Sequence, residues 1–567
     1  MSSHENSASL RRRFHNEEGE DVKSETTFSN SSSSASTKVG VLRWSEKRVW
    51  TFALAFRAAN ALLVQTYFNP DEHWQSLEVA HRIVFGYGHL TWEWKEGIRS
   101  YLHPLLFALL YKILAFLHLD KPLFMAKAPR LFQSLFASIG DLYMYKLSKM
   151  IFDEQVAKWA LFSQFTNWFM FFCITRTFSN SLETMLTLMG IFYWFSSNSS
   201  SKKFSISSRM LGLFIAALTC AVRPTSAITW QYIGLLDLFK MQSRFHFLLF
   251  EVLPIGSLVL ALSSLLDWWM YDSFVLVPLN FLKFNFLSSG GDYYGTHPWH
   301  WYFTQGFPSM LLTFLPYSLI GIFRSKERRI SGLIAWVLGV YSFLGHKEFR
   351  FVLPVLPIAL MFSGYCLAVI AKPDRSGTES KKFKPATKCP SNVQLAVLFL
   401  LVTNVPMALY MSLIHQLRFC LTIYMILTNK LAHQRGSEDV MIHLSKEASK
   451  QGVKSVLFLM PCHSTPYYST LHHDLPMQFL DCTPSSNRTT LAESDFFLMD
   501  PHAFALSMFK NSTIFPSHIV LFSSEEPYLR ELLISYSFTE VRRFFHAHFK
   551  VDRDLQASVV VYSQAIS

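Results

Sequence analysis

Apolar runs alternate with short polar connections over most of this chain, and this pattern constrains the fold more than any other feature. The runs cover residues 49–67, 103–119, 130–147, 157–174, 181–197, 210–222, 226–240, 247–266, 306–323, 331–344, 350–371 and 393–414. A helix needs about 20 residues to cross the hydrocarbon of a bilayer, so the shorter runs indicate tilted, broken or re-entrant segments. The pattern therefore predicts an α-helical polytopic membrane protein with roughly 11–12 membrane segments.

Composition supports a membrane location. Half of the 567 residues are hydrophobic and 16% are charged, whereas a soluble domain carries about a quarter charged residues. The formal net charge is +12, but the basic residues form short clusters between apolar runs rather than one stripe, at residues 11–13, 202–203, 324–329 and 381–384. This distribution is typical of cytoplasmic loops under the positive-inside rule. It argues against nucleic-acid binding.

The chain is expected to have three parts. Residues 1–43 are polar and Ser-rich and predict a disordered cytoplasmic tail without a cleavable signal peptide. Residues 44–425 predict a multispanning catalytic domain with two long luminal loops, 68–102 and 267–305, which are rich in Trp, Tyr, His and Gly. Residues 426–567 predict a small luminal α/β domain, because apolar stretches at 455–460 and 519–522 are typical of buried strands.

Several features of the topology stay open. An even number of full spans after a cytoplasmic N-terminus would place the C-terminal domain in the cytosol, so one segment between 103 and 147 is re-entrant or the count is wrong by one. A luminal C-terminal domain would fit the sequons at Asn487 and Asn511. It would also allow Cys462 and Cys482 to pair. The chain has no CxxC motif and no Cys/His spacing typical of a metal site.

Two adjacent carboxylates, Asp71 and Glu72, follow the first apolar run. Unpaired acids at the edge of a bilayer are costly and need a reason such as binding or proton transfer. One interpretation is a polar helix cap paired with a nearby Arg. The other is a general base that takes the proton of an attacking sugar hydroxyl, with Asp71 as the base and Glu72 orienting the acceptor or sharing that role.

Further polar groups stand at the ends of other apolar runs. Arg99 closes the first long loop and is suited either to lipid headgroups or to a phosphate. Arg176, Asn180 and Glu183 begin another run on the same side. Helix capping would account for Asn180, but it does not account for Arg176 and Glu183, so a substrate-binding role is an alternative.

The second long loop and the segment after it also carry candidate binding groups. A run of aromatic, His and acidic side chains at 290–302 suits a carbohydrate, although an interfacial aromatic belt is the simpler alternative; the candidates are Asp292, His297, Trp299 and His300. The His-Lys-Glu-Phe-Arg segment at 346–350 sits between two apolar runs, where ionisable residues need one another or an anionic ligand. We expect His346, Lys347 and Arg350 to bind the phosphate of a lipid-linked donor.

With these motifs, the chain resembles the eukaryotic mannosyltransferases that use dolichol-phosphate-mannose, a branch of the multispanning C-type glycosyltransferases. The resemblance rests on Asn-Pro-Asp-Glu at 69–72, Arg-Thr-Phe-Ser-Asn at 176–180 with Glu183, and His-Lys-Glu-Phe-Arg at 346–350. Within the family, the run 296–308 is similar to the members that add the third mannose, in α1,2 linkage, to the glycosylphosphatidylinositol precursor. Relatives that mannosylate the N-glycan lipid precursor or add a fourth mannose are the nearest alternatives.

The resemblance implies an inverting transfer in the lumen of the endoplasmic reticulum, with no cofactor and no metal. Inversion needs one base opposite the leaving group, and a departing phosphate is stabilised by Arg or Lys rather than by a general acid. The implied partners are the dolichol-phosphate-mannose donor, the glycolipid acceptor and the membrane. A polytopic lipid transporter or scramblase, or a non-catalytic subunit, would be the alternative of another class.

Overall fold

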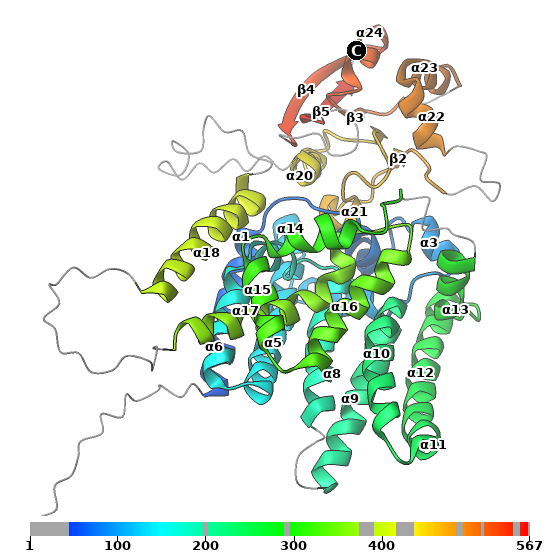
Figure 1. Ribbon diagram of the computed structural model, residues 1–567. Helices are drawn as coiled ribbons and strands as arrows, with labels where there is room; N and C mark the ends of the chain where they lie inside the picture. Colours follow the sequence, from blue (N-terminus) through cyan, green and yellow to red (C-terminus); the bar gives the residue numbers. More distant parts are fainter. Residues whose placement is uncertain are drawn as a thin grey trace, which may run out of the picture. The chain divides into compact units, whose positions relative to one another are not determined.

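The structure of the chain is a computed structural model, which describes residues 45–196, 202–287, 295–372, 391–414, 436–483, 492–511, 515–547 and 556–564. The predicted tail at 1–43, the predicted domain boundary at residue 425 and Asn487 all lie outside these residues, as does the side chain of Asn511. Residues 44–567 form one compact unit, in which a helical part precedes an α/β part (Figure 1).

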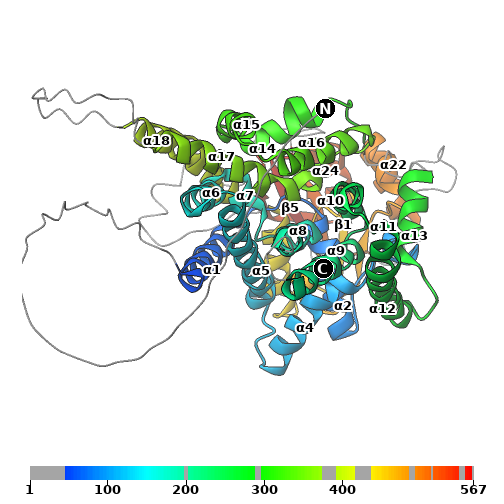
Figure 2. The same ribbon diagram turned by 60° about the horizontal axis from the view of Figure 1, so that its bottom comes forward.

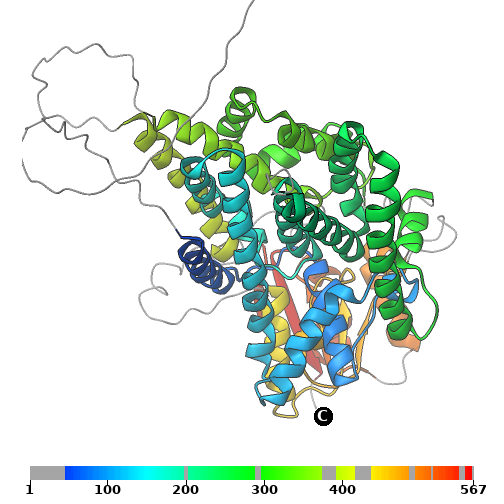
Figure 3. The same cartoon turned by 90° about the horizontal axis from the view of Figure 1, so that it is seen from below.

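Each apolar run predicted from the sequence falls on one helix or on two consecutive helices. The helical part contains α1 (Glu46–Leu63), α2 (Glu78–Phe85), α3 (Trp92–Lys95), α4 (Leu102–Phe116), α5 (Pro122–Ile151), α6 (Glu154–Thr166), α7 (Trp168–Cys173), α8 (Ser179–Ser196), α9 (Lys202–Val222), α10 (Ala227–Lys240), α11 (Arg244–Phe247), α12 (Leu253–Tyr271), α13 (Val277–Leu282), α14 (Phe307–Leu311), α15 (Phe314–Arg324), α16 (Arg328–Phe343), α17 (Leu356–Ile370) and α18 (Asn392–Leu409). α1 packs beside α5 (Figure 2), and α9 packs between α8 and α12 (Figure 3).

Local sequence explains where several helices begin. The carboxylate of Asp153 accepts a hydrogen bond from the backbone N–H of Val156 (2.8 Å) and so starts α6. Asn167 ends α6 and also starts α7, because its side chain accepts from the N–H of Met170 (3.0 Å) and donates to the carbonyl of Met310 (2.9 Å). The predicted run 157–174 is therefore broken at Asn167.

Three described helical stretches are long and apolar enough to cross a membrane, judged by length and composition. They are Arg244–Tyr271, Phe349–Ile370 and Asn392–Leu413, and the pair Tyr302–Leu311 and Phe314–Arg324, bent by 107°, would be a fourth if it forms one span. Within an 18-residue apolar part of each stretch, 83% is buried in Phe349–Ile370 and only 11% in Arg244–Tyr271. The first stretch is therefore part of the core, whereas the second exposes an apolar surface suited to lipid.

The first predicted span, 49–67, contains the polar residues Arg57 and Asn60, and buried contacts explain both. Arg57 of α1 donates to both carboxylate oxygens of Asp141 of α5, at 2.6 and 2.9 Å, and both side chains are fully buried. Asn60, one turn further along α1, donates to the carbonyl of Phe171 (2.8 Å). Charges inside a helical bundle are tolerated when they pair in this way, so these residues join helices rather than ending a span.

The α/β part is built on one mixed sheet with the strand order β2-β1-β3-β5-β4. β1 is parallel to β2 and β3, whereas β5 is antiparallel to β3 and β4. Its elements are α20 (Gly436–Ala448), β1 (Val456–Leu459), α21 (Tyr468–Leu471), β2 (Met477–Phe479), α22 (Glu493–Met499), α23 (Pro501–Asn511), β3 (His518–Phe522), α24 (Glu526–Ser535), β4 (Phe538–Phe545) and β5 (Ser558–Gln564). β1 and β3 lie at the two stretches predicted as buried strands.

The two faces of the sheet have different partners. Leu457 and Leu459 of β1 point to the core formed with α22, α23 and α24. Val456 and Phe458, which alternate with them, point to a core formed with α20 and α21. That second core also contains Trp74, which comes from the helical part of the chain.

The α/β part is held to the loop after α1 by polar contacts as well. The indole N–H of Trp74 donates to the carbonyl of Thr465 (3.2 Å). The buried carboxylate of Glu78, in α2, accepts from the backbone N–H groups of Tyr467 (2.8 Å) and Ser469 (3.2 Å) at the start of α21. These contacts join positions nearly 400 residues apart in the chain, with a separation of 391 for both Trp74–Thr465 and Glu78–Ser469.

We predict that Glu78→Ala loosens this junction, because the donors of Tyr467 and Ser469 would be left buried without an acceptor. Such a loss costs about 1–3 kcal/mol of unfolding free energy. Chemical unfolding of the detergent-solubilised protein would measure the cost, and faster hydrogen exchange at α21 would locate it. Glu447→Ala is the matched control, since the carboxylate of Glu447 pairs with the exposed Lys450 on the surface of the α/β part. Equal exchange at α21 in both variants would contradict the prediction.

Candidate active site

The predicted base and the predicted phosphate-binding segment meet directly. A guanidinium nitrogen of Arg350, Nη1, forms an ion pair with Asp71 Oδ2. The Nε and Nη2 atoms of the same Arg350 donate to both oxygens of Glu348, at 2.6 and 2.8 Å. The two motifs, 279 positions apart when measured from residue 69 to residue 348, therefore form one charged group.

The Asn-Pro-Asp-Glu turn is shaped by its own side chains. Asn69 accepts a hydrogen bond from the backbone N–H of Asp71 through its side-chain oxygen (3.0 Å), which is an Asx-type turn. The amide nitrogen of Asn69 donates to Glu348 Oε2 (3.2 Å). The turn continues into a π-helical stretch, η1 (His73–Leu77), a conformation often found at functional sites. Asn69 thus fixes both the turn and its distance from Glu348.

Glu348 is the centre of the charged group. It accepts from Arg350, from Asn69 and from His346, whose Nε2 lies 3.0 Å from Glu348 Oε1. Burial alone would raise the pKa of Glu348, but the charges of Arg350 and His346 hold it well below its usual value. The backbone is clamped as well, because the buried hydroxyl of Tyr302 donates to the carbonyl of Glu348 (2.8 Å). The sequence pattern alone gives Glu348 no role of its own, although it lies inside the His-Lys-Glu-Phe-Arg motif.

Glu72 faces the opposite way from Asp71 and is out of reach of a substrate. Its side chain is 1% exposed, whereas that of Asp71 is 22% exposed. Glu72 receives hydrogen bonds from Arg130 Nε and Arg176 Nη1, both at 2.8 Å. Arg130 also donates to Glu438 of α20 (2.8 Å), so Glu72, Arg130, Arg176 and Glu438 form a buried ion cluster. In this geometry both Glu72 and Arg176 pair with other protein groups, and the catalytic and substrate-binding roles expected of them from the sequence stay predictions.

The start of α8 supports the Arg350 segment rather than a substrate. Asn180 donates to the backbone carbonyl of Arg350 (3.0 Å) and accepts from Arg223 (3.2 Å). Arg223 also pairs with the buried carboxylate of Glu183 (3.1 Å), and Ser226 donates to the other oxygen of Glu183. Asn180 and Glu183 are thus fully engaged with the protein. Arg223 was missed in the sequence, where its only signal is an Arg-Pro between two apolar runs.

Lys347 is used to hold the neighbouring loop. Its ammonium group, on a side chain that is almost fully buried, donates to the carbonyls of His297 (2.8 Å) and Leu344 (2.5 Å). The ring of His346 bonds to the carbonyl of Gly295 (2.9 Å), and the N–H of His297 donates to the carbonyl of Gly345 (3.1 Å). The backbone of residues 295–297 is therefore tied to the 345–347 segment.

The side chains of this loop point in different directions. His297 stacks on Trp301 with ring centroids 4.7 Å apart, and His300 bonds to Thr304 (3.2 Å). Trp299 is 69% exposed. Asp292 lies outside the described residues. His297 and Trp299 are therefore open on the surface beside the charged group, and Trp301 and Tyr302 provide the buried support.

Arg99 lies in a separate ion pair on the loop after α2. Its guanidinium donates to both oxygens of Glu93, at 3.1 and 2.7 Å, and its side chain keeps 24% exposure. Gln75 of η1 approaches the same carboxylate, with 3.5 Å between Gln75 Nε2 and Glu93 Oε2. Arg99 is thus linked to the segment that carries Asp71, although not to Arg350 itself. Among the described residues, no group of three or more His, Cys, Asp or Glu side chains is placed to hold a metal ion.

Comparison with known proteins decides the family. Residues 48–472 match the model of the Alg9-like mannosyltransferase family. The chain belongs to this family. The matched region runs past the helical part into α21, so it includes the contacts that Trp74 and Glu78 make with the α/β part.

Individual relatives of the chain are also named as mannosyltransferases. The chain is 61% identical to mannosyltransferase APTG1 of Arabidopsis thaliana over 91% of its own length and 92% of the relative. It is 40% identical to GPI alpha-1,2-mannosyltransferase 3 of Bos taurus, with 88% and 86% covered, and 37% identical to the protein of that name in Homo sapiens, with 95% and 91% covered.

The fold is that of a C-type glycosyltransferase. ArnT from Cupriavidus metallidurans, in a crystal structure bound to undecaprenyl phosphate, superposes with a TM-score of 0.55 at 11% identity, covering 91% of this chain and 97% of ArnT. The family and this fold together establish a membrane-embedded mannosyltransferase.

We predict that Glu72→Gln destabilises the enzyme by on the order of 3 kcal/mol near neutral pH, because it leaves the buried Arg130 and Arg176 short of negative charge. Burial raises the pKa of Glu72, but the two Arg side chains outweigh it and the pKa is lowered from its usual 4.5. A carboxyl with a depressed pKa contributes stability above its unfolded pKa and loses it as the pH falls through the folded value.

The difference in unfolding free energy between wild type and Glu72→Gln should therefore be largest at neutral pH and shrink below about pH 4.5. Chemical unfolding over a pH series measures this. Glu96→Gln, at an exposed side chain in the neighbouring loop, serves as the control and should follow the wild type. A pH-independent difference would show that Glu72 does not act through its charge.

Proposed function

We propose that this enzyme transfers mannose from dolichol-phosphate-mannose to the glycosylphosphatidylinositol precursor, as the third mannose in α1,2 linkage. The observation that carries the chemistry is the contact between Asp71 and Arg350, which joins a partly exposed carboxylate to a guanidinium at the end of a core helix. The choice of acceptor is supported by the bovine and human relatives named GPI alpha-1,2-mannosyltransferase 3.

Asp71 is the proposed general base. It takes the proton from the acceptor hydroxyl as that oxygen attacks the anomeric carbon of the donor mannose, and the bond from this carbon to the phosphate oxygen breaks. The electron pair leaves with the phosphate, so no general acid is needed. Because the donor is β-linked and attack comes from the opposite face, the product is an α-mannoside.

Arg350 is the proposed partner of the leaving phosphate. A planar guanidinium matches phosphate geometry, and Arg350 can exchange its contact with Asp71 for the donor while both oxygens of Glu348 hold it in place. This exchange frees Asp71 when the donor is present. His346 is next to Glu348 and is the second candidate for the phosphate. Lys347, expected to take part as well, is assigned to holding the 295–297 backbone.

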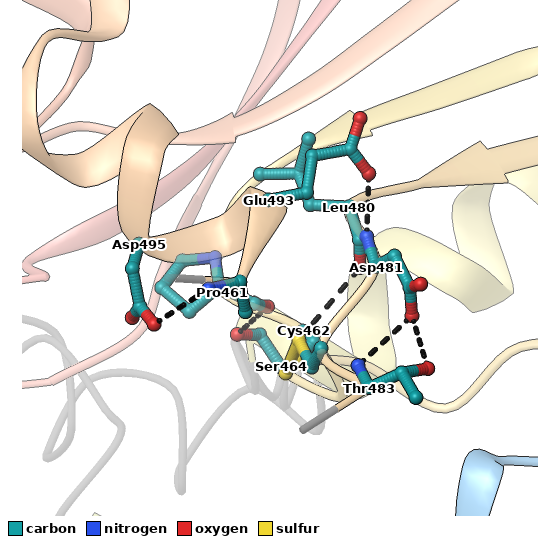
Figure 4. Close-up of a disulfide and its surroundings, with 10 residues drawn as sticks. Pro461, Cys462, Ser464, Leu480, Asp481, Thr483, Glu493 and Asp495 are labelled. Atoms are coloured by element: carbon teal, nitrogen blue, oxygen red, sulfur yellow. Dashed lines mark hydrogen bonds between the residues drawn. A yellow bond between two sulfur atoms is a disulfide. The ribbon is translucent and has the colours of Figure 1, made fainter. Parts of the chain in front are cut away.

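We propose that the site faces the lumen of the endoplasmic reticulum. A disulfide links Cys462 to Cys482 in the α/β part (Figure 4). The carbonyl of His463, next to Cys462, accepts a hydrogen bond from Tyr67, just before the turn that carries Asp71. Disulfides persist in oxidising compartments and are rare in the cytosol. The disulfide therefore supports a luminal α/β part. Because Thr465 of this part contacts Trp74, which follows Asp71 closely in the chain, it also supports a luminal active site.

We predict that Asp71→Asn abolishes transfer while the protein still folds. Loss of a general base costs roughly 10²–10⁴-fold in rate. In cells that lack the third mannosylation step, the wild type should restore GPI-anchored proteins at the surface and Asp71→Asn should not. Asp474→Asn, at an exposed aspartate of the α/β part, is the matched control and should restore them fully.

The accumulating glycolipid separates this proposal from its alternatives. Cells rescued by the wild type should lose the dimannosylated precursor. Absence of rescue together with correction of an N-glycan precursor defect, or of a fourth mannosylation step, would assign the enzyme to a related acceptor. Rescue by Asp71→Asn would remove the base and support a non-catalytic role.

We also predict that Arg350→Lys keeps the charge but lowers activity. Lys cannot hold Glu348 with two parallel hydrogen bonds and also reach a phosphate, so the KM for the donor should rise by at least about tenfold. Steady-state kinetics with purified enzyme and dolichol-phosphate-mannose measure this. An unchanged donor KM would place the phosphate elsewhere, with His346 as the next residue to test.

A further inference from the structure

The imidazole of His463 is a polar group beside the active site that the mechanism above does not use. His463 lies in the α/β part, in the segment between β1 and α21. Its carbonyl accepts a hydrogen bond from the hydroxyl of Tyr67 (2.8 Å), and its ring lies 4.8 Å from the ring of Trp74. Tyr67 and Trp74 stand on either side of the Asn-Pro-Asp-Glu turn, so His463 is placed across the turn that carries Asp71.

Three carboxylates are near enough to act on the charge of this ring. Burial lowers the pKa of His463, while the charges of Glu93, Asp71 and Asp481 act against this shift. Glu93 belongs to α3, Asp71 to the turn after α1, and Asp481 to the segment that follows β2, so the acids come from three different elements. Within the part of the chain that the structure describes, the ring nitrogens of His463 make no hydrogen bond to the protein. They are available to a ligand.

The backbone at His463 is held in an unusual conformation. Its φ of 61° lies in the left-handed region, which costs a residue with a Cβ roughly 1 kcal/mol or more. The preceding residue, Cys462, is fixed by its disulfide to Cys482, and Ser464 on the other side bonds to the carbonyl of Pro461 (2.5 Å) (Figure 4). Such strained positions persist where the surroundings determine them and are frequent at ligand sites.

The chemistry of Arg350 and of His463 indicates which substrate binds beside each of them. The phosphate of the donor is an anion and belongs beside Arg350, at the end of the core helix that carries it. A neutral imidazole brings no positive charge to a phosphate, whereas it can both donate to and accept from a sugar hydroxyl. Inversion also requires the acceptor to approach on the face opposite the leaving phosphate. The His463 side of Asp71 is therefore the acceptor side.

We infer that His463 binds a hydroxyl of the acceptor sugar and orients it toward Asp71, so that the α/β part completes the acceptor site. This inference rests on the proposed function for the identity of the glycolipid. In this arrangement the neutral imidazole uses one nitrogen as donor and the other as acceptor, and the Cys462–Cys482 disulfide keeps the ring beside the turn. His463 makes no contact with the donor phosphate.

The test compares the two Michaelis constants. Purified full-length enzyme is assayed with dolichol-phosphate-mannose and the dimannosylated glycosylphosphatidylinositol precursor from cells blocked at the third mannosylation. His463→Ala should raise the KM for the precursor at least tenfold and leave the KM for the donor within twofold of wild type. His463→Gln, which keeps one donor and one acceptor, should recover part of the loss.

His473→Ala is the matched control. His473 belongs to the same α/β part, but its ring bonds to Ser449 at the end of α20 (3.0 Å), so both KM values should stay at their wild-type levels. If His463→Ala proves unstable, the pair of changes Cys462→Ser and Cys482→Ser provides the second test. Loss of the disulfide should raise the KM for the precursor and leave that for the donor.

The proposed function and the role of His463 are tested by different measurements. Activity of the wild type on the dimannosylated precursor reports whether the function is right, and the ratio of variant to wild type reports on His463. An unchanged precursor KM in His463→Ala, or an equal rise in both KM values, would overturn the inference. If the wild type ignores this precursor and uses another glycolipid, the same ratio measured with that acceptor decides the role of His463.

Discussion

The buried charge of Glu72 is the interaction on which the rest of the site depends. Arg130 belongs to α5 and Arg176 to the segment between α7 and α8, and both bind this carboxylate at 2.8 Å. Glu438 balances the second positive charge, so two acids and two guanidinium groups share one buried site. Removal of any one would leave an uncompensated buried charge, which is far more costly than an exposed one. The loop after α1 is therefore fixed by the helices beneath it.

The side chains of residues 71–78 lie in three different environments. Glu72 points into the helical part, Trp74 and Glu78 point into the α/β part, and Asp71 alone keeps a partly exposed carboxylate next to Arg350. The alternation is possible because the chain leaves α1, forms an Asx-type turn at Asn69 and enters a π-helical stretch. Asp71, the proposed base, is thus fixed from two sides by buried neighbours in its own segment, and a base needs such precise placement.

Local patterns in the sequence predicted much of the fold. Apolar runs and capping residues such as Asp153 mark the helices, and the apolar stretches at β1 and β3 mark the buried strands. The sequence predicts that Asp71 and Arg350 serve one transfer reaction, and their contact agrees with that prediction. Among the described residues, the helices long and apolar enough to span a membrane are fewer than the predicted segments, because some are short and others contain charged residues such as Arg57 and Asp141.

What the sequence did not reveal depends on contacts between distant positions. Glu438 lies 308 residues from Arg130, and His463 lies 396 residues from Tyr67, and no periodicity links such pairs. The roles of adjacent residues were also indistinguishable, because Asp71 and Glu72 carry the same charge and differ only in which way the backbone turns them. Lys347 and Arg350 were grouped for the same reason, although carbonyl groups occupy the first and carboxylates the second.

The chemistry of the donor and of the acceptor explains why we propose that the helical part binds the first and the α/β part helps to bind the second. The donor is a lipid phosphate, and its proposed partner, Arg350, begins a helix that is buried among other helices and apolar enough to span a bilayer. The acceptor sugar is uncharged at its hydroxyls and needs directional polar groups outside the hydrocarbon, which a helical bundle alone supplies poorly. A mixed sheet that docks through Trp74 and Glu78 brings such groups to the opposite side of Asp71. In this proposal, the donor phosphate beside Arg350 and the acceptor hydroxyl beside His463 lie on the two faces of the sugar that inversion requires.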